Sequence, residues 1–296
     1  MNAIDRYWCA PAPAKRLAML RILIGLFAFI YFSVRIVYFA DYGRHSAEQF
    51  RPIGILSLLD APSPPALTWT LALMTSLTGA LFVLGWRFAL TGPLFAALLW
   101  WVTTYRSSWG MIFHTENLMV LHVAVLSLAP AARAWSLDAQ RSDVADDARF
   151  GWPIRLLCAV TVLTYVIAGI AKLREAGLAW VTTDFLRNYV AYDALRKIEL
   201  GSVHSPVGAF FASQAWLWKP LAGFSLATEL AAPVAMVSRR AATVWVLCAF
   251  GFHLGVLALM AIFFPYVVLG VGFASFFRVE RIGEWILAKR AAMRAK

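Results

Sequence analysis

The apolar segment 154–173 ends in Tyr165-Val166-Ile167-Ala168-Gly169-Ile170-Ala171-Lys172-Leu173, and the lysine in this stretch sets it apart from an ordinary lipid-facing helix. Ionisable side chains inside membrane segments are rare and costly, so each one indicates a functional site. On a helix, four residues of this stretch lie on one face, because they occupy positions i, i+3, i+4 and i+7. They are Tyr165, Ala168, Gly169 and Lys172. This face predicts the wall of a packed cavity rather than a surface in contact with lipid.

The composition is typical of a membrane protein that crosses the bilayer several times. The 296 residues are 61% hydrophobic and only 15% charged, and the mean hydropathy is +0.69. Soluble domains have about half apolar and about a quarter charged residues. The net charge of +11 lies in loops and near the C-terminus. This placement is typical of the cytoplasmic segments of a membrane protein, as the positive-inside rule describes, and does not favour a nucleic-acid partner.

Eight membrane spans are predicted, each from a run of roughly 20 apolar residues. The fold class is an all-α bundle that forms a single transmembrane domain over residues 1–296. The second and third spans are joined so closely that they form a helical hairpin. The predicted spans are 17–39, 66–86, 88–105, 112–130, 154–173, 220–237, 241–263 and 265–277.

Charge counting favours a topology with both termini inside. Most of the 27 Lys and Arg residues then lie in cytoplasmic segments. The long outer loop 174–219 contains a segment with helical spacing of apolar residues, Trp180–Lys197. We expect this segment to be an amphipathic helix on the outer surface. With this topology the predicted functional site lies on the outer side of the membrane.

Four polar residues from four predicted spans fall in the outer half of the bilayer. A rise of about 1.5 Å per residue places Lys172 and His114 near the outer face, with His253 and Glu229 deeper. We expect these side chains to meet in one chamber. Burial disfavours the charged ammonium, so a buried lysine can act as a general base. A nearby histidine can stabilise an anion or relay a proton. The chemistry that follows is proton abstraction from a lipid-soluble acid.

Each of these residues also has a structural interpretation. Lys172 can extend to the outer headgroups, and His114 can simply begin a helix at the interface. His253 can be a hydrogen-bonded core histidine. Glu229 can hold a neighbouring helix while protonated. The remaining polar residues of the spans are Arg21, which can meet inner headgroups, and His122, which we expect to pack in the core.

No metal or thiol chemistry is predicted. The chain has no pair of histidines with the spacing of a helical metal site. Its three cysteines include no C-x-x-C pair, so a dithiol mechanism is not indicated.

Several short motifs resemble the membrane domain of vitamin K-dependent γ-glutamyl carboxylase and its bacterial relatives, the HTTM proteins. The most specific is Ala168–Leu173 followed by Trp180, which is similar to A-G-x-K-K-L…W. The others are Leu17–Gly25, resembling L-x-x-x-R-x-x-x-G; Leu84–Arg87, resembling L-G-x-R; Trp109 with His114; Trp135–Asp138, resembling W-S-x-D; and His253 in an aromatic-rich span.

The resemblance implies an enzyme that uses a reduced quinone, either vitamin K or menaquinol, with O2 and CO2 as cosubstrates. Lys172 would be the base that deprotonates the quinol, His114 would assist it, and His253 would line the pocket. The partners would be the lipid bilayer, the quinol, and a peptide or protein substrate on the outer face. The residues expected to contribute to cofactor binding are Tyr165, Gly169, Trp109, Glu229 and Arg21.

The chain departs from the family pattern at three places. Ala171 replaces the first lysine of the family pair, and Phe113 replaces an asparagine before the histidine. We also expect the chain to lack the large C-terminal lumenal region that recruits substrate proteins in the family. The alternative function is a non-catalytic membrane partner or transport component that keeps the fold and a quinone- or lipid-binding cavity. A proton-relay transporter is less favoured because no inverted repeat is visible.

Overall fold

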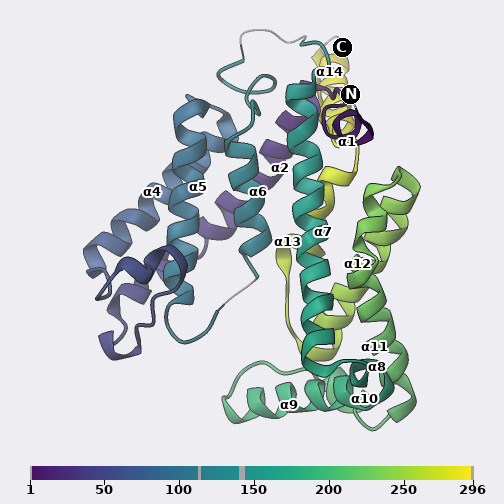
Figure 1. Cartoon of the computed structure of the whole chain (residues 1–296). Helices are drawn as coiled ribbons and strands as arrows, with labels where there is room; N and C mark the ends of the chain where they lie inside the picture. Colours follow the sequence, from purple (N-terminus) through teal and green to yellow (C-terminus); the bar gives the residue numbers. More distant parts are fainter. Residues whose placement is uncertain (1, 113–114, 140–143, 295–296) are drawn as a thin grey trace. The chain divides into compact units, whose positions relative to one another are not determined.

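A computed structural model describes residues 2–112, 115–139 and 144–294, and within these residues the structure is helical (Figure 1). The described residues contain no β-strand, and a single isolated bridge pairs the backbones of Ala12 and Asp147. An all-helical chain satisfies its backbone hydrogen bonds within each segment, as a lipid environment requires. The predicted all-α class is confirmed.

Five helices of the described chain are long and apolar enough to cross a membrane. They coincide with five of the predicted spans. The first predicted span is interrupted, because its helix ends at Ser33 and a second, short helix begins at Ile36. The five helices are α2 (Ala14–Ser33), α4 (Pro65–Leu84), α5 (Phe88–Ser107), α7 (Ala148–Ala176) and α12 (Arg239–Met260).

The other three predicted spans are shorter or broken. The fourth contains α6 (Asn117–Ser127). The sixth contains α11 (Ala215–Leu230), which continues into the 3-10 helix Ala232–Met236. The eighth is not one helix but α13 (Pro265–Val268) followed by the 3-10 helix Val271–Phe276. A count of eight crossings therefore stays a prediction.

The chain divides into two compact units, and the boundary falls within α7. The first unit comprises residues 1–157 and 277–296, and the second comprises residues 158–276. Besides α2, α4, α5 and α6, the first unit contains α1 (Ala3–Trp8), α3 (Ile36–Asp41), three short 3-10 turns between residues 42 and 58, and α14 (Glu280–Arg294).

The guanidinium of Arg21 holds the first unit together. The side chain is fully buried on α2 and donates hydrogen bonds to the carbonyls of Phe82 and Val83 at the end of α4. It also donates to Ala131 and Trp135, in the segment after α6. Carbonyls at a helix C-terminus have no partner within the helix, and here a buried arginine supplies the donors. The sequence-based alternative that Arg21 meets headgroups is wrong.

The α4–α5 hairpin is fixed by the segment that Arg21 also binds. Gly85 ends α4 with a φ of +63°, a conformation that favours glycine, and a Cβ there would come within 2.5 Å of Ser136. The carboxylate of Asp138 accepts hydrogen bonds from the backbone N–H groups of Arg87 and Phe88, at 2.8 and 2.7 Å. Asp138 thereby caps the start of α5.

The second unit contains the lysine end of α7, α11 and α12, together with three helices of the loop 174–219. α9 contacts α8, α10, α11 and α12 and is drawn across the direction of α12 in Figure 1. The Lys197 ammonium on α9 donates to the carbonyl of Met260 at the end of α12, at 2.5 Å. The predicted segment Trp180–Lys197 is helical but falls into two helices, α8 and α9, and its place on the outer surface of the membrane stays a prediction. The loop helices are α8 (Ala179–Thr182), α9 (Phe185–Glu199) and α10 (Pro206–Phe211).

Replacing the buried arginine should unfold the first unit at a lower temperature. Arg21→Met leaves several buried carbonyls without donors, at a cost of about 1–3 kcal/mol each. We expect the Tm in detergent to fall by about 10 °C, measured by size-exclusion chromatography after heating. Arg133→Ala removes an exposed arginine and serves as the matched control. An Arg21→Met protein with an unchanged Tm would contradict this role.

The ion pair between Glu280 and Arg16 should make stability depend on pH. Burial alone raises the pKa of Glu280, but its hydrogen bonds with Arg16 and the charges of Arg16 and Arg278 outweigh burial and hold this pKa below its usual value of 4.5. A lowered folded pKa gives stability that is present above pH 4.5 and is lost as the pH falls through the folded pKa.

Glu280→Gln should therefore lower the Tm near pH 7, and its difference from the unmodified protein should shrink below about pH 4.5. Glu284→Gln, on the same helix but exposed, controls for the loss of one carboxylate. The idea fails if the two glutamine variants show the same pH dependence.

Candidate functional site

Lys172 and Glu229 form an ion pair in the second unit. The Nζ atom of Lys172, near the end of α7, lies 2.5 Å from Oε1 of Glu229 on α11. The glutamate side chain is 3% exposed and the lysine side chain 21% exposed, so the pair is largely buried in the protein. The lysine is thus not a lone headgroup-seeking residue. It has a fixed acidic partner, as ionisable groups at membrane depth usually do.

Trp180 covers the lysine. Its ring lies 5.3 Å from Lys172 Nζ, a distance at which the ring face attracts the ammonium. The indole N–H donates to the hydroxyl of Ser225 on α11, at 3.3 Å. Trp180 also packs with Ala222 and Leu226 in a buried cluster. The tryptophan therefore connects the lysine end of α7 with α11.

Gly169 permits the close approach of α11 to α7. A Cβ at this position would come within 2.8 Å of Leu230 and 3.1 Å of the Cβ of Glu229. Such contacts are tighter than packed side chains allow. The near-absence of a side chain at Gly169, one turn before Lys172, is therefore what brings the glutamate to the lysine.

A second polar pair joins α7 to α12. The hydroxyl of Tyr165 lies 2.8 Å from Nε2 of His253, and both residues are buried. Aromatic rings surround the imidazole, among them Phe252 and Phe264. Tyr165 also packs edge-on against Trp245. His253 is therefore a core histidine with one engaged nitrogen.

The two pairs lie along the same face of α7. Tyr165 and Lys172 are two turns apart on α7, or about 10 Å along the helix axis. Two buried atoms near these pairs, Glu229 Oε2 and His253 Nδ1, have no hydrogen-bond partner within the described chain. Buried polar atoms without partners are uncommon and call for an explanation, such as a bound ligand.

Three other residues were predicted for the site: His114, Trp109 and Arg21. His114 lies outside the described residues, so its place in the expected chamber stays a prediction. Trp109 packs in the first unit with Tyr42, Phe50 and Tyr105. Arg21 is engaged by the carbonyls described above. We therefore leave Trp109 and Arg21 out of the candidate site.

The buried residue His122 is 1% exposed on α6, as expected of a packed core histidine. Within the described chain, no cluster of three or more potential metal ligands occurs.

Sequence reasoning missed a buried network in the first unit. The carboxylate of Glu116 accepts hydrogen bonds from Tyr31 on α2, at 2.5 Å, and from Arg106 on α5. Arg106 also donates to the hydroxyl of Tyr38. Glu116 stands two residues after His114 in the sequence. A glutamate at the start of a helix is common at a membrane surface, so the sequence did not single out Glu116 as buried. The only available signal of this network was a charged residue next to an apolar segment.

Comparison with known proteins identifies a family and no individual relative. The HTTM domain matches residues 9–280, which is most of the chain. Neither a curated protein nor a solved structure matched the sequence. The match includes the lysine stretch, the hairpin and the segment that caps it. With five long apolar helices among the residues that the structure describes, the chain is an integral membrane protein, and it belongs to the HTTM family.

Proposed function

We propose that this protein is a membrane enzyme in which the Lys172–Glu229 pair takes a proton from a reduced quinone. HTTM domains are associated with vitamin K-dependent carboxylase-like membrane proteins. The observation that carries the proposal is the buried ion pair on the family's lysine motif. Glu229 Oε2 is a buried carboxylate oxygen without a hydrogen-bond partner in the described chain, and a bound ligand would account for it.

The residues present fit a quinol ligand. Glu229 Oε2 and His253 Nδ1 are buried and without hydrogen-bond partners in the described chain. The hydroxyl of a quinol could donate a hydrogen bond to either atom. Aromatic residues around His253 give an apolar environment for a ring. When bound, a reduced quinone would supply the acidic hydroxyl and the electrons for chemistry with O2, and CO2 would be the further cosubstrate in a carboxylation.

The pair is suited to accept a proton. Before reaction it is neutral overall, either as ammonium with carboxylate or as amine with carboxylic acid. One proton from a substrate hydroxyl converts both forms into the same product, an ammonium beside a carboxylic acid. The resulting positive charge lies next to the negative charge left on the substrate oxygen, and a low-dielectric site strengthens that attraction. Lys172 and Glu229 thus act as one base.

The environment of Lys172 is arranged for this task. Trp180 limits the movement of the ammonium, and Gly169 fixes the distance to Glu229. Tyr165 and His253 would bind the far side of the ligand and exclude water. We place the site on the outer side of a bacterial inner membrane, with eight crossings, both termini inside and α9 on the outer surface. The orientation rests on charge counting, the eight crossings on the length of the apolar runs, and the bacterial inner membrane on the resemblance to bacterial HTTM proteins.

Turnover should depend on both members of the pair. Purified protein in nanodiscs, supplied with reduced menaquinone or vitamin K and O2, should form the quinone epoxide. Loss of a general base usually costs 100-fold or more, so Lys172→Ala and Glu229→Gln should each reduce the rate by at least about 100-fold. Lys219→Ala removes an exposed lysine of α11 and should leave the rate unchanged.

Lys172→Arg separates the roles within the pair. An arginine stays protonated and cannot be a neutral amine, so activity in this variant would assign the proton to Glu229, and its loss would assign it to Lys172. If the unmodified protein turns over no quinol and Lys172→Ala leaves quinol binding unchanged, the enzyme proposal is wrong. A non-catalytic membrane partner would then be the better description.

A methyl group at Gly169 should damage the site without touching either charge. Gly169→Ala places a Cβ against Leu230 and Glu229, and overpacking of this kind typically costs about 1–3 kcal/mol. We expect a lower Tm and slower epoxide formation. Gly223→Ala, on α11 with no atom within 4 Å of the added Cβ, is the matched control. Equal activity of the two alanine variants would show that the approach of α11 does not set the pair.

A further inference from the structure

The C-terminal helix α14 exposes an apolar face that the described part of its own unit does not cover. Ile282, Trp285, Ile286 and Met293 are each more than a third exposed. They share one side of the helix, because they lie at positions i, i+3, i+4 and i+11. An exposed amphipathic face of this kind indicates a partner.

The first turn of α14 is tied to the start of a membrane-spanning helix. Glu280 accepts two hydrogen bonds from Arg16, at 2.9 and 2.7 Å. Arg16 lies in the first turn of α2, where that helix would enter the bilayer. Gly283 packs so closely on Trp135 that a Cβ would come within 2.6 Å of the indole ring. α14 therefore begins at the level of the membrane surface.

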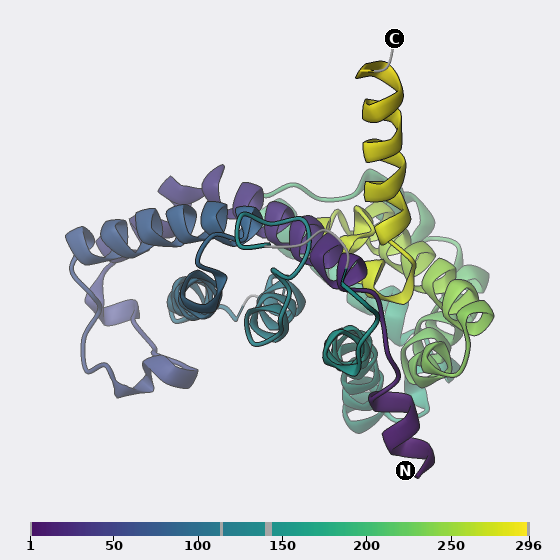
Figure 2. The same ribbon diagram turned by 90° about the horizontal axis from the view of Figure 1, so that it is seen from above.

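From this anchor α14 runs across the direction of α5, which is long enough to span the membrane, and of the shorter apolar helix α6. α5 and α6 are seen along their length in Figure 1 and end-on in Figure 2. α14 is instead seen along its length in Figure 2. A helix that starts at the interface and crosses the spanning direction lies along the membrane surface.

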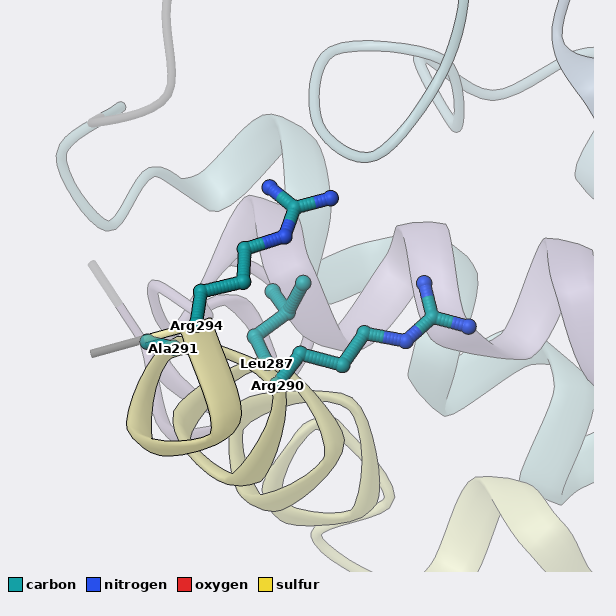
Figure 3. Close-up of a pocket in the computed structure, with 4 residues that line it drawn as sticks. All are labelled: Leu287, Arg290, Ala291 and Arg294. Atoms are coloured by element: carbon teal, nitrogen blue, oxygen red, sulfur yellow. The ribbon is translucent and has the colours of Figure 1, made fainter. Parts of the chain in front are cut away.

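The basic residues of α14 complement an anionic surface. Arg290 and Arg294 are one turn apart, and Figure 3 shows both guanidinium groups extending to the same side, next to Leu287 and Ala291. Within the described chain no ion pair engages either arginine. Lys289 lies over the ring of Trp285, with Nζ 5.0 Å from the centroid. This is the arrangement of a lysine that extends from an apolar face toward headgroups.

We propose that α14 is an interfacial helix that binds anionic phospholipid. Ile282, Trp285, Ile286 and Met293 would enter the acyl boundary, and Arg290 with Arg294 would hold a lipid phosphate between them. Two guanidinium groups provide the paired donors that phosphate oxygens accept. Basic residues at the surface add attraction to anionic leaflets. A nucleic acid would match the charge but would leave the apolar face in water.

The depth of α14 can be tested in the full chain. A spin label at Ile286→Cys, in a chain whose three native cysteines are replaced, should collide with dissolved O2 far more than with a water-soluble nickel complex. The same label at Glu284→Cys, on the opposite face, should show the reverse. Both are measured in nanodiscs with phosphatidylcholine and phosphatidylglycerol. Equal nickel access at the two sites would overturn the proposal, and so would RNA binding with the Ile286 label in water.

The headgroup contact needs a separate measurement. Native mass spectrometry of protein released from these nanodiscs should show phosphatidylglycerol retained over phosphatidylcholine. Arg290→Gln with Arg294→Gln should lower that retention several-fold. Arg290→Lys with Arg294→Lys keeps the charge and should preserve most of it, and free glycerol phosphate should not displace the lipid. Equal retention of the two lipids, or no loss in the glutamine variant, would refute lipid binding by this pair.

Discussion

In an apolar bundle a buried charge must be satisfied by the protein itself, and Arg21 shows how the first unit meets this constraint. Its guanidinium binds carbonyls from the end of α4 and from the segment after α6. Three stretches of sequence that are far apart thereby share one side chain. Removing the guanidinium from the folded protein is costly, because the buried carbonyls then lose their donors and no water can replace them. The hairpin geometry around Gly85 and Asp138 follows from it.

The same constraint acts in the second unit with a different result. Lys172 is satisfied by one carboxylate, and that carboxylate keeps an oxygen without a partner in the described chain. Arg21 has delocalised donors that suit several carbonyls, whereas an amine can gain or lose a proton. The two cations therefore suit different purposes. A guanidinium closes a fold, and an amine paired with a carboxylate can carry out proton transfer.

Much of the architecture could be predicted from the sequence. Apolar runs located the five long helices, and the lysine stretch singled out α7. The pairing of Lys172 with Glu229 agrees with the expected convergence of those residues, although they are far apart in sequence. His253 was placed among aromatic residues, but its bond to Tyr165 could not be foreseen, because periodicity gives a face and not a partner.

Other features depend on tertiary contacts that periodicity does not encode. The run 17–39 reads as one span, yet the helix ends at Ser33 and restarts after Arg35. Arg21 seemed shallow enough for headgroups, but the returning hairpin covers it. The bonds among Tyr31, Arg106 and Glu116 join three helices, and no single segment carries a sign of them. The sequence singled out Trp180 only as part of the family motif. Its contact with Lys172 depends on how the helices of the loop 174–219 pack against α7, which the motif does not indicate.

The sequence separation of the ion pair has a consequence for biosynthesis. Glu229 follows Lys172 by 57 residues, so at roughly 5–20 residues per second the ribosome makes it several seconds later. During that interval α7 holds a lysine without its carboxylate. A lysine near a helix end can wait at the headgroups at little cost, while a lysine in the middle of the helix would obstruct insertion. The position of Lys172 near the end of α7 thus lets the helix enter the bilayer first and receive its acidic partner afterwards.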